Sequence, residues 1–312
     1  MIAIVGAGMA GLACARALED AGHRTALFDK GRKAGGRMSC REGTSPAGPV
    51  AFDHGAQYMT GRDPAFLAQL AAWRAAGLVA PWPAAGPEAW VGVPGMNAPL
   101  LALGRDLPVR WGTRVEALVR EEAGWRLTGE GLDEGGFRAV LTAIPAEQTA
   151  TLLRDCAPDF AGIAGRTPSA PCWTAMAAFP ARLPIGGDVL RTEGAVAWAA
   201  RNSAKPDRPA TEAWVIQASP GWSRTHLERE APPVADALLA EFFAAAGIAA
   251  TAPSALTAHR WRYAKSGAAE RATMWDPERG IGACGDWLTG PRVENAWLSG
   301  RRLAEAVAGS VG

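Results

Sequence analysis

The sequence predicts an α/β fold that combines a parallel-sheet domain with a second, mainly antiparallel β domain. Three observations support this prediction. The chain opens with an apolar strand, a glycine-rich turn, a helix and a second strand within its first 30 residues. It closes with a short strand and a helix at residues 280–307. Between them, apolar segments at 171–179, 195–200 and 214–218 are separated by polar turns, which is typical of antiparallel strands.

The first elements of the chain follow one another without long loops. Residues 2–5 are an unbroken apolar run, as expected for a strand buried on both faces. Residues 12–21 have the composition of a helix, and Gly22 stands where helices commonly end. Residues 24–28 are expected to form the second strand, with Asp29 at its end.

The turn at residues 6–11 has the G-x-G-x-x-G spacing of a Rossmann-type dinucleotide-binding domain. In this pattern Gly6 permits the tight turn, Gly8 lets the backbone approach a pyrophosphate, and Gly11 lets the helix pack closely on the strand. The phosphates then meet free N–H groups and the positive end of the helix dipole. Asp29 stands about 20 residues further on, where an acid accepts hydrogen bonds from a ribose hydroxyl. We therefore expect this domain to bind a dinucleotide.

A second glycine-rich turn indicates which dinucleotide it is. Residues 30–37 read Lys-Gly-Arg-Lys-Ala-Gly-Gly-Arg, a stretch with no stereotyped role in NAD enzymes. It resembles the GG-Arg motif of the flavin amine oxidase superfamily, which includes monoamine oxidases, protoporphyrinogen oxidase and renalase. In that family the arginine lies over the pyrophosphate and near the flavin, so the resemblance implies that Gly36 and Arg37 contact FAD. The alternative is a solvated basic loop.

Residues 53–58 read Asp-His-Gly-Ala-Gln-Tyr. This is similar to the Asp-x-Gly-Ala-Gln-Tyr pattern of renalases and of a bacterial group of NAD/FAD-dependent oxidoreductases. The resemblance implies that the segment runs beside the flavin, where Gly55 and Ala56 would let the backbone approach the ring. His54 is then a candidate for contact with flavin or substrate, although a lone histidine is usually structural.

The C-terminal segment carries a further signal. Residues 280–286 read as a strand that ends in Gly-Asp, and residues 292–296 open a helix. Flavoproteins with two dinucleotide-binding domains and amine oxidases share this arrangement. The resemblance implies that Asp286 hydrogen-bonds the ribitol and that N–H groups at the helix start face flavin N1 and O2, where reduction places negative charge. Pro291 and Asn295 depart mildly from the family's Gly-Arg-Val-Glu-Gly-Ala. An ordinary strand–loop–helix is the alternative.

The resemblance spans nearly the whole chain and implies a Rossmann-type FAD-binding domain at residues 1–75, 105–160 and 256–312, with a mainly antiparallel β substrate domain at 76–104 and 161–255. It places the backbone of Val115 at the adenine and implies non-covalent FAD, since no cysteine suited to flavin attachment precedes the Gly-Asp strand. The residues that it assigns to FAD are Gly6, Gly8, Met9, Ala10, Gly11, Asp29, Lys30, Gly36, Arg37, Met38, Gly55, Ala56, Val115, Gly285, Asp286, Arg292, Val293, Glu294 and Ala296.

The last strand of the second domain is expected at residues 256–263. Alternation would point His259, Trp261 and Tyr263 to one face and Arg260 and Arg262 to the other. The aromatic face suits either the core or contact with flavin and substrate.

In the polar turn at 201–206 we favour Arg201 as a ligand, because Asn202 and Lys205 suit the turn and the surface. The candidates for the substrate or flavin face are His54, Tyr58, Arg201, His259 and Trp261.

Composition narrows the class of protein. A hydrophobic content of 48% and a charged content of 20% describe an ordinary globular chain, and the net charge of +1 gives no reason to expect nucleic-acid or membrane partners. No apolar run approaches the roughly 18 residues of a membrane span, and no secretory signal opens the chain, so we expect a cytoplasmic protein. Five cysteines without a C-x-x-C pair and four scattered histidines disfavour a metal site or a disulfide framework.

The resemblance implies an oxidoreductase that transfers hydride from a small substrate to flavin N5, after which dioxygen yields hydrogen peroxide. The renalase-like pattern implies oxidation of dihydropyridine isomers of NAD(P)H, which need no strong general base. Two alternatives stay open. An amine oxidase or desaturase of the same superfamily would need an aromatic cage, for which Trp261, Tyr263, Trp287 and Trp297 are candidates. A non-catalytic FAD-binding or redox-sensing protein would need no dedicated substrate.

Overall fold

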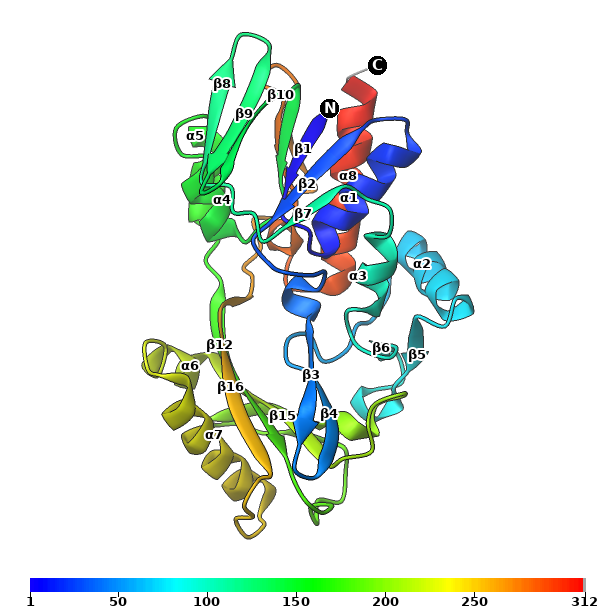
Figure 1. Cartoon of the computed structure of the whole chain (residues 1–312), viewed down its shortest axis with the longest axis vertical. Coiled ribbons are helices and arrows are strands. Elements are labelled where there is room, and N and C mark those ends of the chain that lie inside the picture. Colours follow the sequence, from blue (N-terminus) through cyan, green and yellow to red (C-terminus); the bar gives the residue numbers. More distant parts are fainter. Residues whose placement is uncertain (311–312) are drawn as a thin grey trace. The chain divides into compact units, whose positions relative to one another are not determined.

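The computed structural model describes residues 1–310 and divides the chain into two compact units, each of which is discontinuous in sequence (Figure 1). Unit 1 comprises residues 1–36, 100–169 and 266–312, described up to residue 310, and unit 2 comprises residues 37–99 and 170–265. Residues 37–75 and 256–265, which the sequence analysis assigned to the FAD-binding domain, therefore pack within unit 2.

Unit 1 is built on a six-stranded sheet with the order β17-β18-β11-β1-β2-β7. Its strands are β1 (Ile2–Val5), β2 (Thr25–Asp29), β7 (Val109–Trp111), β11 (Ala139–Thr142), β17 (Met274–Asp276) and β18 (Ile281–Ala283). All neighbours are parallel except β17 and β18. Every residue of β1 is at most 5% exposed, so the prediction of a strand buried on both faces is confirmed.

Two helices of unit 1 lie side by side, namely α1 (Met9–Asp20) and α8 (Val293–Ser310) (Figure 1). Gly300 makes this contact possible, because a Cβ atom there would overlap the carbonyl group of Ala10. The chain enters α1 shortly after β1 and α8 shortly after β18, and these strands run in the same direction. Both helices therefore begin at the same edge of the sheet, where ligands bind in open α/β folds.

The remaining elements of unit 1 complete its core. A three-stranded antiparallel sheet is formed by β8 (Ala117–Glu121), β9 (Gly124–Gly129) and β10 (Leu132–Phe137), and two helices, α4 (Ala146–Leu152) and α5 (Pro158–Gly165), follow β11. Phe28 of β2 meets Phe137 of β10 edge to face, with ring centroids 5.9 Å apart. The two sheets therefore share one apolar core.

Unit 2 is built on a five-stranded antiparallel sheet with the order β13-β14-β15-β12-β16. Its strands are β12 (Ala170–Ala178), β13 (Val189–Arg191), β14 (Val196–Arg201), β15 (Ala213–Ala218) and β16 (Ala255–Lys265). The helix α7 (Ala231–Ala246) packs on this sheet through Val234, Leu238 and Phe242, with the Phe242 ring 5.1 Å from that of Trp214. The mainly antiparallel second domain is therefore confirmed.

The hairpin of β3 (Cys40–Ser45) and β4 (Gly48–Asp53) explains why residues 37–75 join unit 2. Val50 and Phe52 of β4 pack against Met176 and Val215 of the five-stranded sheet. Unit 2 also contains α2 (Pro64–Ala75), the pair β5 (Val79–Pro81) and β6 (Trp90–Gly92), and α6 (Pro220–Thr225). A short helix, α3 (Ala98–Leu103), and the 3-10 turns Gly36–Met38, Pro83–Ala85, Asn202–Ala204 and Asp286–Leu288 complete the chain.

Within residues 1–310, no helix combines the length and apolarity needed to cross a membrane. The same residues contain no cluster of histidine, cysteine and acidic side chains that could hold a metal ion.

Candidate functional site

The glycine-rich turn between β1 and α1 leaves no room for side chains at two of its positions. Gly6 has φ +104°, and a Cβ atom there would lie 2.6 Å from the carbonyl oxygen of Ala143. A Cβ atom on Gly11 would overlap the carbonyl oxygen of Gly6 itself. Both positions therefore need glycine for the turn and for close packing of helix on strand.

Gly8 differs from these two glycines. Apart from Gly8 itself and its neighbours in the chain, no atom lies within 4 Å of where its Cβ would be, and Gly8 is the N-terminal cap of α1 without a side-chain hydrogen bond. The N–H groups of a first helical turn lack partners within the helix, and the first turn of α1 carries no acidic residue. The open space at Gly8 and the positive end of α1 together suit a phosphate.

Asp29 joins the two glycine-rich turns of unit 1. Its Oδ2 accepts a hydrogen bond of 2.6 Å from the N–H of Ala7, and its Oδ1 accepts one of 2.6 Å from the N–H of Gly31. A carboxylate oxygen can accept more than one hydrogen bond, so Asp29 keeps acceptor capacity for a ribose hydroxyl.

The predicted C-terminal residues lie at the start of α8. Gly285 has φ +152°, a Cβ atom there would lie 2.6 Å from the Trp287 ring, and its N–H donates to Ser299 Oγ at 3.0 Å. Asp286 is buried, and its carbonyl oxygen accepts from the N–H of Gly290 at 2.6 Å. These bonds fix the turn that leads into α8.

The residues at the start of α8 fit this turn. Asn295 donates from Nδ2 to the carbonyl oxygen of Gly290 at 3.0 Å. Arg292 pairs with the buried Glu294 at 2.9 Å. Val293 is the first residue of α8, and the N–H of Ala296 donates to the backbone carbonyl oxygen of Arg292 at 3.1 Å. Asn295 thus fastens the loop to the first turn of the helix.

In unit 2 the segment after β4 has an internal reason for its small residues. A Cβ atom on Gly55 would overlap the carbonyl oxygen of Arg37, and the Ala56 N–H donates to that same oxygen at 2.8 Å. The resemblance had implied that Gly55 lets the backbone approach a flavin ring. The contact with Arg37 accounts for the glycine without any ligand.

Three of the predicted substrate-face residues come together in unit 2. The rings of His54 and Trp261 stack with centroids 5.3 Å apart, and His259 lies edge-on to both, at 5.1 Å and 4.4 Å respectively. Trp261 Nε1 also donates to the carbonyl oxygen of His54 at 2.8 Å. We call His54, His259 and Trp261 the aromatic cluster.

The imidazoles of the aromatic cluster are uncharged near neutral pH. Burial, followed by repulsion from His259 and Arg41, lowers the pKa of His54 to about 4. Burial, followed by repulsion from Arg41, also lowers the pKa of His259. His54 is 5% exposed, its Nε2 lies 3.3 Å from Ser39 Oγ, and its Nδ1 has no partner among the described residues. The cluster is therefore an uncharged, aromatic group in unit 2.

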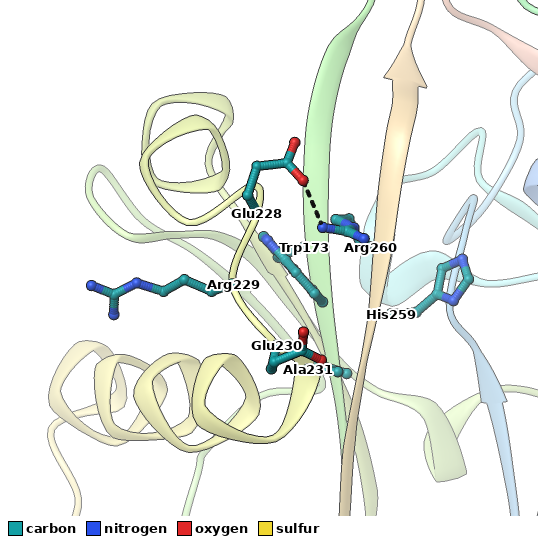
Figure 2. Close-up of a pocket in the computed structure, with 8 residues that line it drawn as sticks. Trp173, Glu228, Arg229, Glu230, Ala231, His259 and Arg260 are labelled. Carbon is teal, nitrogen blue, oxygen red and sulfur yellow. Dashed lines mark hydrogen bonds and ion pairs between the residues drawn. The ribbon is translucent and has the colours of Figure 1, made fainter.

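The predicted alternation along β16 is confirmed for four of its five residues, because His259 contacts Trp261 whereas Arg260 and Arg262 share Glu228 as a partner (Figure 2). Figure 2 shows Arg260 on the side of the strand away from His259. Arg260 and Arg262 both pair with Glu228, at 3.2 Å and 2.7 Å. A hollow of about 540 Å³ lies beside Glu228 and Arg260, lined also by Trp173, Arg229, Glu230, Ala231, Ala258 and His259, although the His259 ring itself is directed to the other side of the strand (Figure 2). Because Glu228 is already engaged with two arginines there, we place the candidate site on the opposite, aromatic side.

Arg201 is not available as a ligand. Its side chain is buried, and its guanidinium makes five hydrogen bonds, to Glu212, Asp188 and the carbonyl oxygens of residues 183, 185 and 187. A guanidinium has five N–H donors, so none is left for a substrate. The expectation that Arg201 binds a ligand is therefore corrected: the residue fastens β14 to the loop before β13.

The ring of Tyr58 contacts a residue outside the aromatic cluster. Its ring meets that of Trp198 at 5.5 Å, and the guanidinium of Arg191 lies 4.7 Å from the same Trp198 ring. Of the five candidates, the structure thus brings together His54, His259 and Trp261.

Sequence reasoning missed the role of Lys205, which it assigned to the surface. The Lys205 side chain is 0% exposed, and its Nζ lies 3.1 Å from Oδ2 of Asp53. Arg208 reaches the same oxygen at 2.7 Å. An apolar segment that ends in Asp53 could have signalled this pairing, because a buried carboxylate needs a charged partner.

Comparisons with known proteins agree with this architecture. A sequence family described as an NAD(P)-binding Rossmann-like domain matches residues 4–72. A structure from Exiguobacterium sp. 255-15, assigned as a protoporphyrinogen oxidase, superposes with a TM-score of 0.77 at 13% identity, covering 98% of each chain. Cyclohexylamine oxidase from Brevibacterium oxydans IH-35A gives 0.71 at 16% identity over 99% of each chain. Putrescine oxidase bound to putrescine gives 0.66 at 14% identity, covering 99% of this chain and 98% of that one.

The chain shares its fold with these oxidases. Because the match covers both units, it extends beyond the glycine-rich turn to the antiparallel sheet.

Proposed function

We propose that the chain is an FAD-dependent oxidoreductase of the flavin amine oxidase type. The observation that carries this proposal is the likeness in fold to cyclohexylamine and putrescine oxidases over almost the whole chain. A dinucleotide-binding turn alone would suit many enzymes, whereas this combination of two domains is shared with the oxidases.

The residues of unit 1 fit FAD. The space in front of Gly8 and the N-terminus of α1 would receive the pyrophosphate, and Asp29 would accept from a ribose hydroxyl. The N-terminus of α8, at the same edge of the sheet, offers a second set of N–H groups for an electron-rich ring. FAD supplies hydride acceptance and transfer of electrons to dioxygen when it is bound. Cys284 is fully buried in the core of unit 1, which supports non-covalent attachment.

For the substrate we propose a dihydropyridine isomer of NAD(P)H, as in renalase-like enzymes. The aromatic cluster supports this proposal because its uncharged imidazoles and indole suit a flat, neutral ring. Such a donor gives up hydride without prior loss of a proton, so it places no demand on a strong base. With Arg201 fully engaged elsewhere, the cluster would bind and orient the ring by stacking.

An amine oxidase is the second candidate, favoured by the substrates in the names of two structural neighbours. An aromatic cage would then flank the substrate. Trp287 and Trp297 are 1% and 3% exposed, so they belong to the interior of unit 1. Trp261 and Tyr263 are left as candidates for the cage.

Anaerobic rapid mixing distinguishes these substrates. The yellow protein would be mixed with the 2- and 6-dihydro isomers of NAD(P), with ordinary NADPH and with benzylamine, while the visible flavin band is followed. Rapid bleaching by the isomers alone supports the renalase-like proposal. Bleaching by benzylamine supports the amine oxidase instead, and no bleaching by any donor argues for a non-catalytic FAD-binding protein.

A further inference from the structure

A buried group of charges lies beside the aromatic cluster in unit 2. Asp53, Lys205 and Arg208 have side chains that are 0% exposed. Oδ2 of Asp53 receives both Lys205 Nζ, at 3.1 Å, and an Arg208 nitrogen, at 2.7 Å. Oδ1 of Asp53 accepts from the N–H of Met96 at 2.9 Å. We call Asp53, Lys205 and Arg208 the charge cluster.

The charge cluster has one more cation than it needs for a simple ion pair. No carboxylate other than Asp53 pairs with Lys205 or Arg208 among residues 1–310. The nearby thiol of Cys40 stays protonated, because burial and Asp53 raise its pKa to about 12. Arg208 is also held by the carbonyl oxygens of Pro206 and Gly92, at 2.8 Å and 2.9 Å. Arg208 thus satisfies Asp53 on its own, and the second buried cation calls for a separate explanation.

Lys205 makes two contacts that Arg208 does not make, and one of them is with the Trp82 ring, whose centroid lies 5.1 Å from Nζ. The other is with Gln57, whose Oε1 lies 3.3 Å from the same Nζ. With that oxygen held, Nε2 of Gln57 donates to the carbonyl oxygens of Asp53 and Gly55, the latter at 3.1 Å. Lys205 therefore acts on the backbone at both residues that flank His54.

The segment around His54 also receives hydrogen bonds from the five-stranded sheet. Gln217 of β15 donates to the carbonyl oxygen of Gly55 at 2.7 Å, and Trp261 of β16 donates to that of His54 at 2.8 Å. Asn202, in the 3-10 turn that follows β14, donates to the carbonyl oxygen of Ala51 at 2.7 Å. The His54 peptide is thus held between the sheet and the side chain of Gln57.

From these contacts we propose that Lys205 is a positioning residue for the aromatic cluster, which acts through Asp53 and Gln57 to keep the His54 ring buried against Trp261. Lys205 itself contacts Asp53, Gln57 and Trp82, none of which belongs to that cluster. Its relevance to substrate binding rests on the proposed function, whereas the positioning itself does not.

The test is the titration of the His54 ring, followed by ¹H–¹³C NMR of the full-length protein labelled at histidine. The His54 signal is assigned by its loss in His54→Phe. In the parent protein this ring should stay neutral from pH 8 to pH 5. In Lys205→Met the loosened ring should gain water and titrate at least one pH unit higher, a tenfold change in its protonation constant.

Two further variants make the test decisive. Gln57→Met removes the link without changing a charge and should move the His54 titration in the same direction. Glu212→Gln weakens another buried ion pair of unit 2, with Arg201, and should leave the titration unchanged. If Lys205→Met does not fold, Gln57→Met decides.

Unchanged titration in folded Lys205→Met or Gln57→Met would overturn the proposal, as would an equal shift in Glu212→Gln, which would indicate general loosening. The titration involves no substrate turnover, so its failure is distinguishable from failure of the proposed function.

Discussion

Trp261 and His54 are joined twice: the indole Nε1 donates to the backbone carbonyl oxygen of His54 at 2.8 Å, and the two rings stack 5.3 Å apart. They are separated by 207 residues in the sequence. This contact ties the strand β16 to the segment that follows β4. It also keeps the imidazole in surroundings where a positive charge is unfavourable.

The first prediction concerns pH and stability. An imidazole in the unfolded chain has a pKa near 6.5, whereas burial lowers that of His54 to about 4. Between these values the unfolded state binds more protons, so the free energy of unfolding should fall as pH drops from 6.5 to 4. The His54 contribution is at most about 3.4 kcal/mol. His54→Phe keeps a ring but cannot be protonated, so urea unfolding at pH 7 and pH 4.5 should show a smaller loss for this variant. Equal losses in both proteins would refute the assignment.

The second prediction separates two glycines of one turn. Gly11→Ala should destabilise the protein by a few kcal/mol, on the order of other overpacked sites, because its methyl group would overlap the carbonyl oxygen of Gly6. Gly8→Val faces open space and should change the free energy of unfolding of the apoprotein by less than about 1 kcal/mol. It should nevertheless weaken FAD binding at least about tenfold, since its side chain would occupy the space proposed for the pyrophosphate. Thermal unfolding and FAD titration measure the two effects, and undiminished FAD affinity in Gly8→Val would contradict the proposed placement.

The third prediction concerns Asp29. Asp29→Ala removes the acceptor for the N–H groups of Ala7 and Gly31 as well as the proposed ribose contact. FAD affinity should fall by roughly 10- to 100-fold, in line with about 1.5–3 kcal/mol for a hydrogen bond to a charged group. Asp29→Asn retains one oxygen acceptor, so its FAD affinity should lie between those of the parent protein and Asp29→Ala. Fluorescence titration of apoprotein with FAD provides the measurement, and equal affinity in all three proteins would exclude Asp29 from the cofactor site.

The fourth prediction distinguishes a structural arginine from a ligand. Arg201→Met leaves Glu212, which is 7% exposed, without its cation. Removing one partner of a buried pair costs about 3–5 kcal/mol, so chemical denaturation should show a loss of this size. The KM of the folded fraction for the proposed substrate should stay within about twofold, because no donor of Arg201 is free. A raised KM without loss of stability would restore Arg201 as a substrate ligand.

The sequence was most informative where local pattern determines structure. The apolar run at residues 2–5, the glycine spacing after it and the alternation along β16 each depend on neighbours within a few residues. The structure accordingly has these elements where they were predicted. Gly6 and Gly11 also have the close backbone contacts that the motif requires.

The buried charge cluster could not be read in the same way. Lys205 lies in a turn rich in polar residues, where local composition favours the surface, and its partner Asp53 is 152 residues away. The same reason explains the assignment of residues 37–75. The hairpin β3–β4 follows the glycine turn in sequence, but Val50 and Phe52 find their apolar partners on strands 120 or more residues later.

The most direct test of the central claim is to identify the cofactor of the purified full-length protein. The protein would be precipitated with acid, and its supernatant and pellet analysed for flavin by chromatography and absorbance. We predict close to one FAD per chain, all of it in the supernatant. A colourless protein whose apo form binds NAD(P) but not FAD would contradict the account, and yellow colour left in the pellet would contradict non-covalent attachment.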